Sequence, residues 1–336
     1  MGMKIEGSCS AITNVISLRL GIPPGGDMFP RRHTTKHDLT PDCYKMDVEG
    51  TRVETMEDYL IGETIGEGTF SKVKLGIHKE SRRKVALKFV QLDIIEATIG
   101  MEQFRREIEI HSQMNHPNIA KLYSVIDIPE QKKTCLVVEF VQGKDMLDTI
   151  LDHPGGRLPE KLASSYFKQI VQAVQYLHEN GITHRDLKLE NICVEQDVCK
   201  LIDFGFANYY QPGFSMRTPC GSSIYAAPEV LMRTNYSGPK ADVWSLGVML
   251  YSMVCGKIPW EGNSVNEQLY SATRGEWSLI PSASVNVQNL LLGCLEVSAE
   301  GRMGILDVSE HSWVSAELVK RNFGGSFKKM MRKIVA

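Results

Sequence analysis

The clearest pattern of apolar and polar residues begins near residue 58. The stretch "DYLIGETIGEGTFSKVKLGIHKESRRKVALKFVQL" alternates the two kinds of residue between turn signals, which predicts three antiparallel strands. "MEQFRREIEIHSQM" repeats apolar positions at helical spacing, and "NIAKLYSVID" and "TCLVVEFV" predict two further strands. We therefore expect a small antiparallel sheet with one helix in this part of the chain.

The pattern changes after residue 145. "PEKLASSYFKQIVQAVQYLHENG" predicts a long amphipathic helix that stops at Gly181, and helices and loops follow to about residue 316. The apolar run "SLGVMLYSMVCG" is too short to span a membrane and predicts a core helix. The fold class is therefore α+β. We expect one domain over 58–316, with a small lobe at 58–139, a connection near 139–145 and a larger helical lobe at 146–316.

The two ends of the chain differ from this domain. Residues 1–57 are rich in Pro, Gly and polar residues without a sustained period, and we expect a disordered tail. They show neither a secretory signal nor a myristoylation site, since Glu6 stands where that site needs Ser or Thr. Residues 317–336 are basic. A calmodulin-binding or membrane-surface helix through 320–336 and a solvated helix both remain open readings.

Composition narrows the class of protein further. The chain has 336 residues and a formal net charge of −2, so no basic surplus indicates a nucleic-acid partner. Its eight cysteines are scattered without a CxxC pair, which is typical of reduced thiols in a cytoplasmic protein. We expect a cytoplasmic location, with the nucleus as a second compartment.

The glycine-rich stretch "GEGTFSKV" (66–73) lies between two predicted strands. Gly66 and Gly68 would let backbone N–H groups approach phosphate oxygens, although a plain hairpin turn explains the same residues. The third glycine of the fuller phosphate-binding pattern is replaced by Ser71.

The strand "VALK" (85–88) carries a lysine among apolar residues. Lys88 either reaches past the sheet edge to water or is held against phosphates by a carboxylate of the following helix. Spacing alone leaves Glu102, Glu107 and Glu109 as candidate partners.

Two further stretches, "HRDLKLEN" (184–191) and "IDFG" (202–205), concentrate charged groups. Asp203 ends an apolar strand, where an aspartate also commonly starts a turn. Asp203 and Asn191 supply two oxygen ligands of the kind that Mg²⁺ takes when it is shared with a nucleotide. Asp186 is then available to accept a proton from an attacking hydroxyl.

These motifs occur in one order and end with "APE" (227–229). In this combination the chain resembles the eukaryotic serine/threonine protein kinases over about residues 59–316. "RTPCGSSIYAAPEV" and "GPKADVWSLG" look most like the calcium/calmodulin-dependent group and, within it, the kinases related to the AMP-activated kinase. The resemblance implies a two-lobed kinase fold, ATP and Mg²⁺ as cofactors, and protein substrates.

The resemblance also implies a role for each matching residue. Lys88 would hold the α- and β-phosphates and pair with Glu107, which the family pattern selects because it stands nine residues before His116. Val138 would be the gatekeeper, the residue before the hinge. The implied catalytic residues are Asp186, Lys188, Asn191 and Ser222. The implied ATP-binding residues are Gly66, Glu67, Gly68, Val73, Ala86, Lys88, Glu107, Val138, Glu139, Val141, Cys193 and Asp203, with Asn191 and Asp203 on Mg²⁺.

The type of acceptor follows from the same resemblance. Lys188 and Ser222 match kinases that act on serine and threonine, and Phe206 after Asp-Phe-Gly goes with a preference for serine. Asp145 and Glu190 match positions that hold an arginine upstream of the acceptor; solvated surface acids are the alternative.

Regulation by an upstream activating kinase is implied by Arg185, beside the catalytic aspartate, and by Thr218 in the activation loop. Thr218 is equally a plain loop threonine until modification is shown. Gln103 and Asn208 stand where other kinases bring cations to the phosphate, so we expect weak coupling to phosphorylation.

His111 is a second departure from the family, since an aliphatic residue normally packs there against Phe204. A charged histidine would be costly in that place, so we expect activity to fall below about pH 6.

The remaining alternatives concern the function itself. A catalytically inactive kinase-fold scaffold predicts the loss of Lys88, Asp186 or Asp203, and all three are present. A small-molecule phosphotransferase on a related fold would lack the "APE" segment and its anchoring arginine, for which Glu229 and Arg302 are the match.

Overall fold

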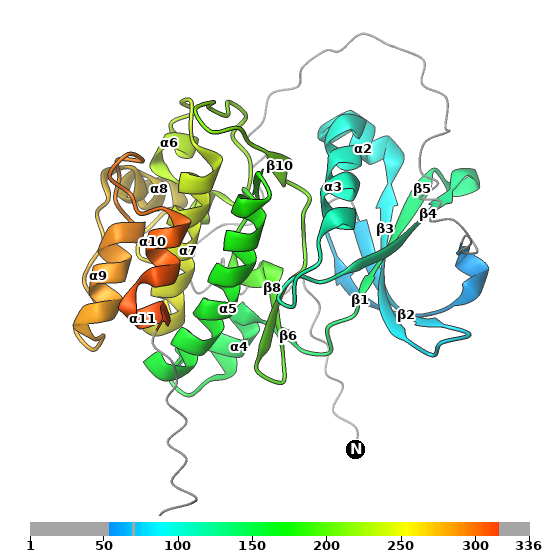
Figure 1. Cartoon of the computed structure of the whole chain (residues 1–336), viewed down its shortest axis with the longest axis horizontal. Helices are drawn as coiled ribbons and strands as arrows, with labels where there is room; N and C mark the ends of the chain where they lie inside the picture. The colour runs from blue at the N-terminus through cyan, green and yellow to red at the C-terminus, as the bar shows by residue number, and fades with distance from the viewer. Residues whose placement is uncertain (1–53, 69–70, 316–336) are drawn as a thin grey trace, which may run out of the picture.

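The computed structural model describes residues 54–68 and 71–315. They form two lobes, an antiparallel sheet with two helices and a mostly helical body, joined by one extended connection (Figure 1). The predicted two-lobed α+β fold is confirmed. The predictions for the two tails lie outside the described residues, apart from 54–57.

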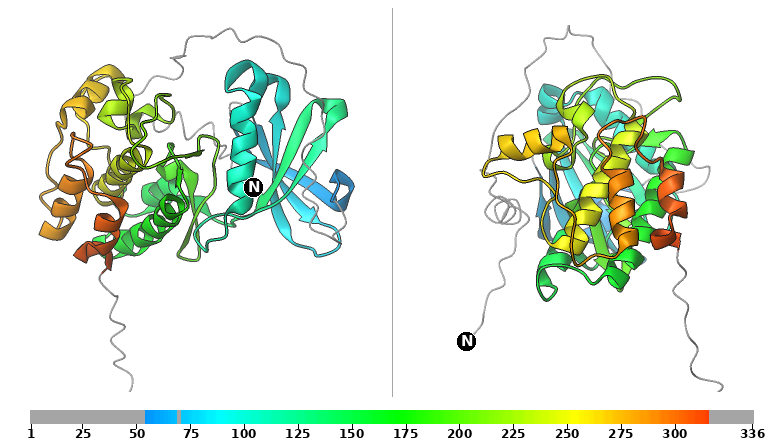
Figure 2. Two further views of the ribbon diagram at one scale, coloured as in Figure 1. Left: turned by 45° about the horizontal axis from the view of Figure 1, so that its top comes forward. Right: turned by 90° about the vertical axis from the view of Figure 1, so that its left-hand side faces the viewer.

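The small lobe is built on one five-stranded antiparallel sheet. Its strands lie in the order β1 (Tyr59–Glu67), β2 (Ser71–His78), β3 (Lys84–Gln91), β5 (Lys133–Glu139) and β4 (Leu122–Ile128), as the alternating pattern predicts. Helices α2 (Leu92–Thr98) and α3 (Met101–Gln113) complete the lobe. Phe104 and Ile108 of α3 pack against Leu136 and Val138 of β5. Figures 1 and 2 place α3 between this sheet and the helical lobe.

The large lobe is organised around two long helices, α5 (Glu160–Glu179) and α7 (Gly238–Cys255). Gly181, with φ +71°, follows the end of α5 as predicted. The buried α7 contains the predicted core helix, and none of the described helices is long and apolar enough to cross a membrane. The other elements are β6 (Lys144–Asp145), α4 (Met146–Asp152), β7 (Ile182–Thr183), β8 (Ile192–Glu195), β9 (Val198–Leu201), β10 (Asn208–Tyr209), α6 (Pro228–Leu231), α8 (Val265–Arg274), α9 (Val285–Cys294), α10 (Ile305–Glu310) and α11 (Ser312–Ser315).

Phe204 connects the cores of the two lobes. It is fully buried in the large hydrophobic cluster, which also takes in Ile110 of α3 and Met114 directly after that helix. On its α3 side the ring of Phe204 stacks on His111, with ring centroids 4.6 Å apart and an angle of 26° between the planes. A histidine therefore fills an apolar position, which is favourable only while its ring is uncharged.

The surroundings of His111 keep it uncharged. Burial lowers its pKa to about 4, although the hydrogen bond from its Nε2 to the carbonyl oxygen of Ala120 (2.7 Å) opposes the shift. The side chain consequently remains neutral at pH 6. The expected fall in activity below about pH 6 stays a prediction, and a pKa of about 4 places the charging of His111 in the folded protein at a lower pH than that.

A buried ion pair holds the "APE" segment against the large lobe. The guanidinium of Arg302 donates to both carboxylate oxygens of Glu229, at 2.8 and 2.9 Å. Three backbone carbonyls accept the remaining N–H groups of Arg302. Its guanidinium carbon, Cζ, lies 4.9 Å from the ring centroid of Trp244. The side chain of Arg302 is 0 % exposed, so loss of its carboxylate partner would leave a buried positive charge unpaired.

We predict that Glu229→Gln lowers the free energy of unfolding by about 3–5 kcal/mol, because it removes one partner of a buried charge pair. Urea unfolding measures the change. The control is Glu102→Gln, which breaks the exposed Glu102–Arg106 pair of α3 and is expected to cost less than about 1 kcal/mol. Equal losses in the two variants would contradict the anchoring role of Glu229.

His111 generates a second prediction. The unfolded chain binds a proton at the ordinary histidine pKa of 6.5, whereas the folded chain does so only near 4. The free energy of unfolding therefore falls as the pH drops from 6.5 to 4, by about 3 kcal/mol from this group alone. In His111→Leu that part of the decline should be missing. Unfolding curves measured across this window test it, and parallel declines in both proteins would refute the assignment.

Candidate active site

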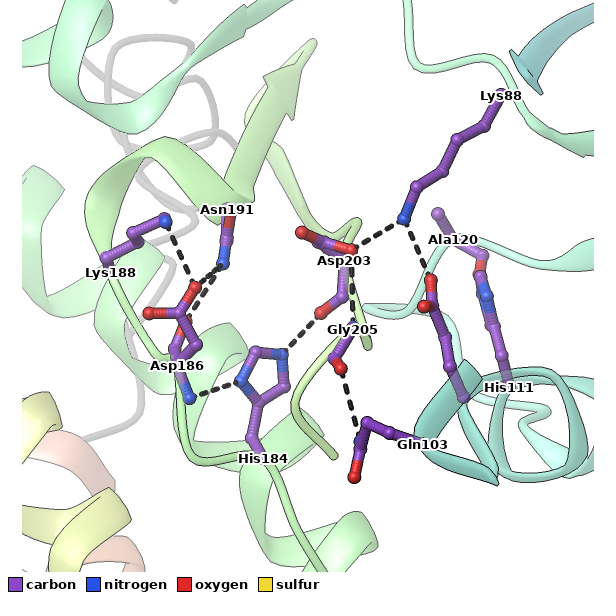
Figure 3. A network of polar contacts seen from close by, with 11 residues as sticks. Lys88, Gln103, His111, Ala120, His184, Asp186, Lys188, Asn191, Asp203 and Gly205 are labelled. Atoms are coloured by element: carbon purple, nitrogen blue, oxygen red, sulfur yellow. Dashed lines mark hydrogen bonds and ion pairs between the residues drawn. The ribbon is translucent and has the colours of Figure 1, made fainter. Parts of the chain in front are cut away.

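A network of charged side chains lies where the two lobes meet (Figure 3). Lys88 of β3 extends to it, and its Nζ lies 2.8 Å from Glu107 Oε1 and 2.9 Å from Asp203 Oδ1. Of the three glutamates that spacing left open, the structure selects Glu107. Glu102 pairs with Arg106, and Glu109 accepts a hydrogen bond from Tyr209.

Burial and charge act against each other in this cluster. Burial by itself would lower the pKa of Lys88, but the carboxylates of Asp203 and Glu107 outweigh it and raise that pKa. Burial would raise the pKa of Asp203, but Lys88 outweighs it and holds that pKa well below its usual range. For Glu107 burial prevails over Lys88 and the pKa is raised. Lys88 and Asp203 are therefore firmly ionised at neutral pH.

The catalytic loop brings a second cluster opposite the first. Asp186 Oδ2 lies 3.0 Å from Lys188 Nζ, and Asp186 Oδ1 accepts the backbone N–H of Ser222 at 2.7 Å. Lys188 Nζ also donates to Ser222 Oγ at 3.1 Å. Asn191 Nδ2 donates to the backbone oxygen of Asp186 at 2.9 Å and to its Oδ2 at 3.3 Å. All four expected catalytic residues are thus in one place.

The buried carboxylate of Asp242 holds this loop from below. It accepts the backbone N–H groups of His184 and Arg185, at 2.9 and 2.8 Å, and the hydroxyl of Thr183 at 2.7 Å. Arg185 has φ +66°, a conformation that a non-glycine residue adopts only when its surroundings enforce it. Asp242 supplies that constraint and so determines where Asp186 lies.

His184 links the loop to the Asp-Phe-Gly turn. Its Nδ1 accepts the backbone N–H of Asp186 at 3.2 Å, so its Nε2 carries the proton and donates to the carbonyl oxygen of Asp203 at 2.6 Å. Its ring lies 5.5 Å from that of Phe204. His184 therefore relates the positions of Asp186 and Asp203 without reaching the reacting atoms.

The two expected magnesium ligands fit that ion in type. Asp203 Oδ1 is engaged by Lys88 and by the backbone N–H of Gly205, and the side chain is 39 % exposed. The side-chain nitrogen of Asn191, Nδ2, bonds to Asp186. The side-chain oxygen, Oδ1, takes no part in those bonds and points away from them. A carboxylate and an amide oxygen are ligands that Mg²⁺ accepts. Bound there with a nucleotide, the ion would neutralise phosphate charge.

The sheet places the expected nucleotide-binding residues around the same junction. Gly68 and Ser71 close a turn through reciprocal backbone hydrogen bonds of 2.8 and 3.4 Å. Strand register sets Val73 opposite Lys88, and Ala86 opposite the gatekeeper Val138. The other members of the set are Gly66 and Glu67 at the end of β1, Glu139 at the end of β5, Val141 in the connection that follows, and Cys193 on β8.

The two acids expected to bind substrate also lie near one another. Asp145 caps α4 through the backbone N–H of Asp148 (2.8 Å), and burial, with Asp148 and Glu190 nearby, raises its pKa to about 6. Glu190 accepts a hydrogen bond from Tyr225 at 3.2 Å, and burial raises its pKa. Lys188 and the hydrogen bond from Tyr225 oppose the shift at Glu190, but burial outweighs them.

Tyr236 connects Arg185 with Thr218, because it is a side-chain hydrogen-bond partner of Arg185 and bonds to the backbone of Thr218. Thr218 is exposed, and its carbonyl oxygen accepts the Tyr236 hydroxyl at 3.0 Å. The Nε of Arg185 donates to the carbonyl oxygen of Phe206 at 2.7 Å.

Sequence reasoning missed two residues that shape the site. Gly221 has φ +87°, and a Cβ there would lie 2.3 Å from the carbonyl oxygen of Arg185, so only glycine lets the segment approach the catalytic loop. Tyr225 orients Glu190. Gly221 stands directly before Ser222 in "PCGSS", and this was the available signal.

Comparison with known proteins agrees with this geometry. The family profile described as Protein kinase domain matches residues 59–314. The probable serine/threonine-protein kinase MARK-C of Dictyostelium discoideum is 35 % identical over 295 residues, which are 87 % of this chain and 36 % of that protein. The chain thus spans about a third of the length of that relative. With a two-lobed fold and these motifs at their junction, the chain belongs to the protein kinase family.

Proposed function

We propose that this protein is a serine/threonine protein kinase that uses Mg²⁺ and ATP. The observation that carries the proposal is the simultaneous placement of two charge clusters, Lys88–Glu107–Asp203 and Asp186–Lys188–Asn191. The first suits a magnesium-bound nucleotide and the second suits an acceptor hydroxyl. Phosphoryl transfer depends on positioning and charge compensation, which such an arrangement supplies.

In the proposed reaction a substrate hydroxyl oxygen forms a bond to the γ-phosphorus of ATP, and the bond from that phosphorus to the β,γ-bridging oxygen breaks. Asp186 orients the hydroxyl and accepts its proton, and ADP leaves. Lys188, which already contacts Asp186 and Ser222, compensates negative charge on the transferring group. Lys88, held by Glu107, does the same for the α- and β-phosphates.

We further propose that the substrate is a protein serine with an arginine upstream. Ser222 beside Asp186 and Lys188 supports action on an aliphatic hydroxyl, and Phe206 supports serine over threonine through the family resemblance. The half-buried pair Asp145 and Glu190 supports arginine recognition, because a guanidinium would compensate both carboxylates.

Phosphorylation of Thr218 by an upstream kinase is part of the proposal. The exposed position of Thr218 suits modification, and Arg185 is the cation that a phosphate there would approach. Neither Gln103 nor Asn208 adds positive charge. The phosphate is therefore expected to act on the part of the activation loop that faces the protein substrate. It should change the KM for the protein substrate more than kcat.

The two alternatives have less support. The features that favoured an inactive scaffold were Ser71 and His111, but Ser71 closes the glycine-rich turn and His111 packs uncharged on Phe204. A small-molecule phosphotransferase is disfavoured because the Glu229–Arg302 pair anchors the segment that borders a protein substrate in kinases.

We predict that Asp186→Asn lowers kcat by about 10²-fold or more, because asparagine cannot accept the proton. The measurement is transfer of radiolabelled phosphate from Mg-ATP to a basic serine peptide by the purified full chain, before and after treatment with an activating kinase. Glu96→Gln, on the exposed side of α2, is the control and should retain wild-type activity. Wild-type transfer onto sugars or other small molecules, but not onto peptide, would instead favour the phosphotransferase reading.

Substrate selection is predicted from the acidic pair. Four matched peptides, with serine or threonine as acceptor and arginine or alanine upstream, should be ranked by kcat/KM with serine and arginine best. Glu190→Gln, and Asp145→Asn, which keeps a helix-capping side chain, should each reduce the advantage of arginine by about tenfold. An advantage that survives in both variants would show that arginine, if preferred, is bound elsewhere.

A further inference from the structure

We propose that Gln103 is a positioning residue: its uncharged amide fastens the segment after Asp203 to helix α3, so that the catalytic arrangement forms without a phosphate on Thr218. The inference rests on the proposed kinase function. It concerns a position where the sequence departs from the family, which brings a cation there.

The geometry begins with one amide and two carbonyls. Gln103 Nε2 donates to the carbonyl oxygens of Gly205 and Ala207, both at 3.2 Å, and Figure 3 shows the first of these bonds beside the active-site network. An amide nitrogen has two protons, so both bonds form at once. Both acceptors lie within four residues after Asp203. Gln103 therefore joins α3 to the backbone that carries a proposed magnesium ligand.

The same helix holds Lys88. Gln103 precedes Glu107 by four residues, which places the two side chains one turn apart on neighbouring parts of one helix face. Glu107 bonds to Lys88, and Lys88 bonds to Asp203. Helix α3 is therefore bonded to the Asp-Phe-Gly turn in two ways: through Glu107 and Lys88 to Asp203, and through Gln103 to Gly205. Movement of α3 away from the large lobe would break both connections together.

The orientation of the amide is set by its neighbour. Arg106 donates to Gln103 Oε1 at 3.3 Å and is itself held by Glu102 at 2.6 Å. If the amide were turned over, its oxygen would face two carbonyl oxygens and its NH₂ would face a guanidinium. Gln103 is therefore fixed as the donor toward the segment.

The far end of the segment has its own attachments. Tyr209 donates its hydroxyl proton to Glu109 at 3.0 Å and accepts from Gln113 at 3.2 Å, so α3 holds the segment at a second point. Strand β10 pairs with β7, with Asn208 opposite Thr183 at the start of the catalytic loop. Residues 205–209 thus lie between α3 and the loop that carries Asp186.

None of these contacts uses the side chain of Thr218. Arg185 donates to the carbonyl oxygen of Phe206, inside the same segment. A cation at position 103 would gain strongly from a nearby phosphate, whereas a neutral amide gains little. The contacts that hold residues 205–209 therefore do not need a phosphate as a partner.

The decisive variant is Gln103→Glu, which keeps the size of the side chain and the helix propensity but removes the donor and sets a carboxylate against two carbonyl oxygens. In the full chain, kcat should fall by about tenfold or more. Gln103→Lys, which retains donors, should stay within about threefold of wild type. The control on the same helix is Ser112→Ala, whose hydroxyl bonds only to the backbone of α3, and it should match wild type.

Thr218→Ala tests the independence from phosphate. We expect its kcat to remain within about threefold of wild type, with any loss appearing in the KM for peptide. Amide hydrogen exchange of residues 203–209 is measured on the same proteins without substrate. It should be faster in Gln103→Glu and unchanged in Ser112→Ala and Thr218→Ala.

The outcomes separate the two proposals. If Gln103→Glu matches Ser112→Ala in both kcat and exchange, Gln103 has no positioning role. If Thr218→Ala loses kcat as severely as Asp186→Asn, the arrangement needs the phosphate and the inference fails in that part. If wild type transfers no phosphate at all, the proposed function fails, while hydrogen exchange still decides whether Gln103 holds the segment.

Discussion

The ion pair between Lys88 and two carboxylates is the interaction on which the rest of this structure depends. Each partner comes from a different part of the molecule: β3, α3 and the turn after β9. Taking charges out of water is costly, and the cost is offset only when all partners are in place. The pair therefore forms only when sheet, helix and large lobe have adopted one relative position.

Buried polar groups elsewhere serve the same relative position. Asp242 holds the catalytic loop by its backbone, His184 relates Asp186 to Asp203, and Arg302 fixes the segment after Ser222 through Glu229. Each has hydrogen-bond partners that only the folded chain supplies, so an error in one would leave a buried polar group unsatisfied. This explains how a loop residue with positive φ, Arg185, is tolerated next to the proposed catalytic base. The strain lies where positional accuracy is needed.

Helix α3 is the element through which these constraints reach the small lobe. Its buried face packs on the sheet through Phe104 and Ile108, while Ile110 and His111 contact the core of the large lobe. Two of its side chains are unusual for the family, and both contact the Asp-Phe-Gly turn. His111 stacks on Phe204, and Gln103 bonds to Gly205. A neutral ring and a neutral amide here make the junction depend on packing and hydrogen bonds more than on charge.

Much of this protein is determined by the sequence alone. Strand alternation, the helical spacing of 101–114 and the long amphipathic helix before Gly181 are local patterns, and the elements follow them because burial repeats with the same period. The chemical groups of the site stand in short motifs and are therefore legible without a structure. Spacing alone left Glu102, Glu107 and Glu109 open as partners of Lys88; the family resemblance selected Glu107, and the tertiary structure shows that this residue meets Lys88 while the other two bond elsewhere. It likewise decided the lowered pKa of His111, the need for glycine at 221 and the partners of Gln103. These depend on contacts with other elements, such as that of Gly221 with Arg185 or of Gln103 with Gly205, and no local pattern records such contacts.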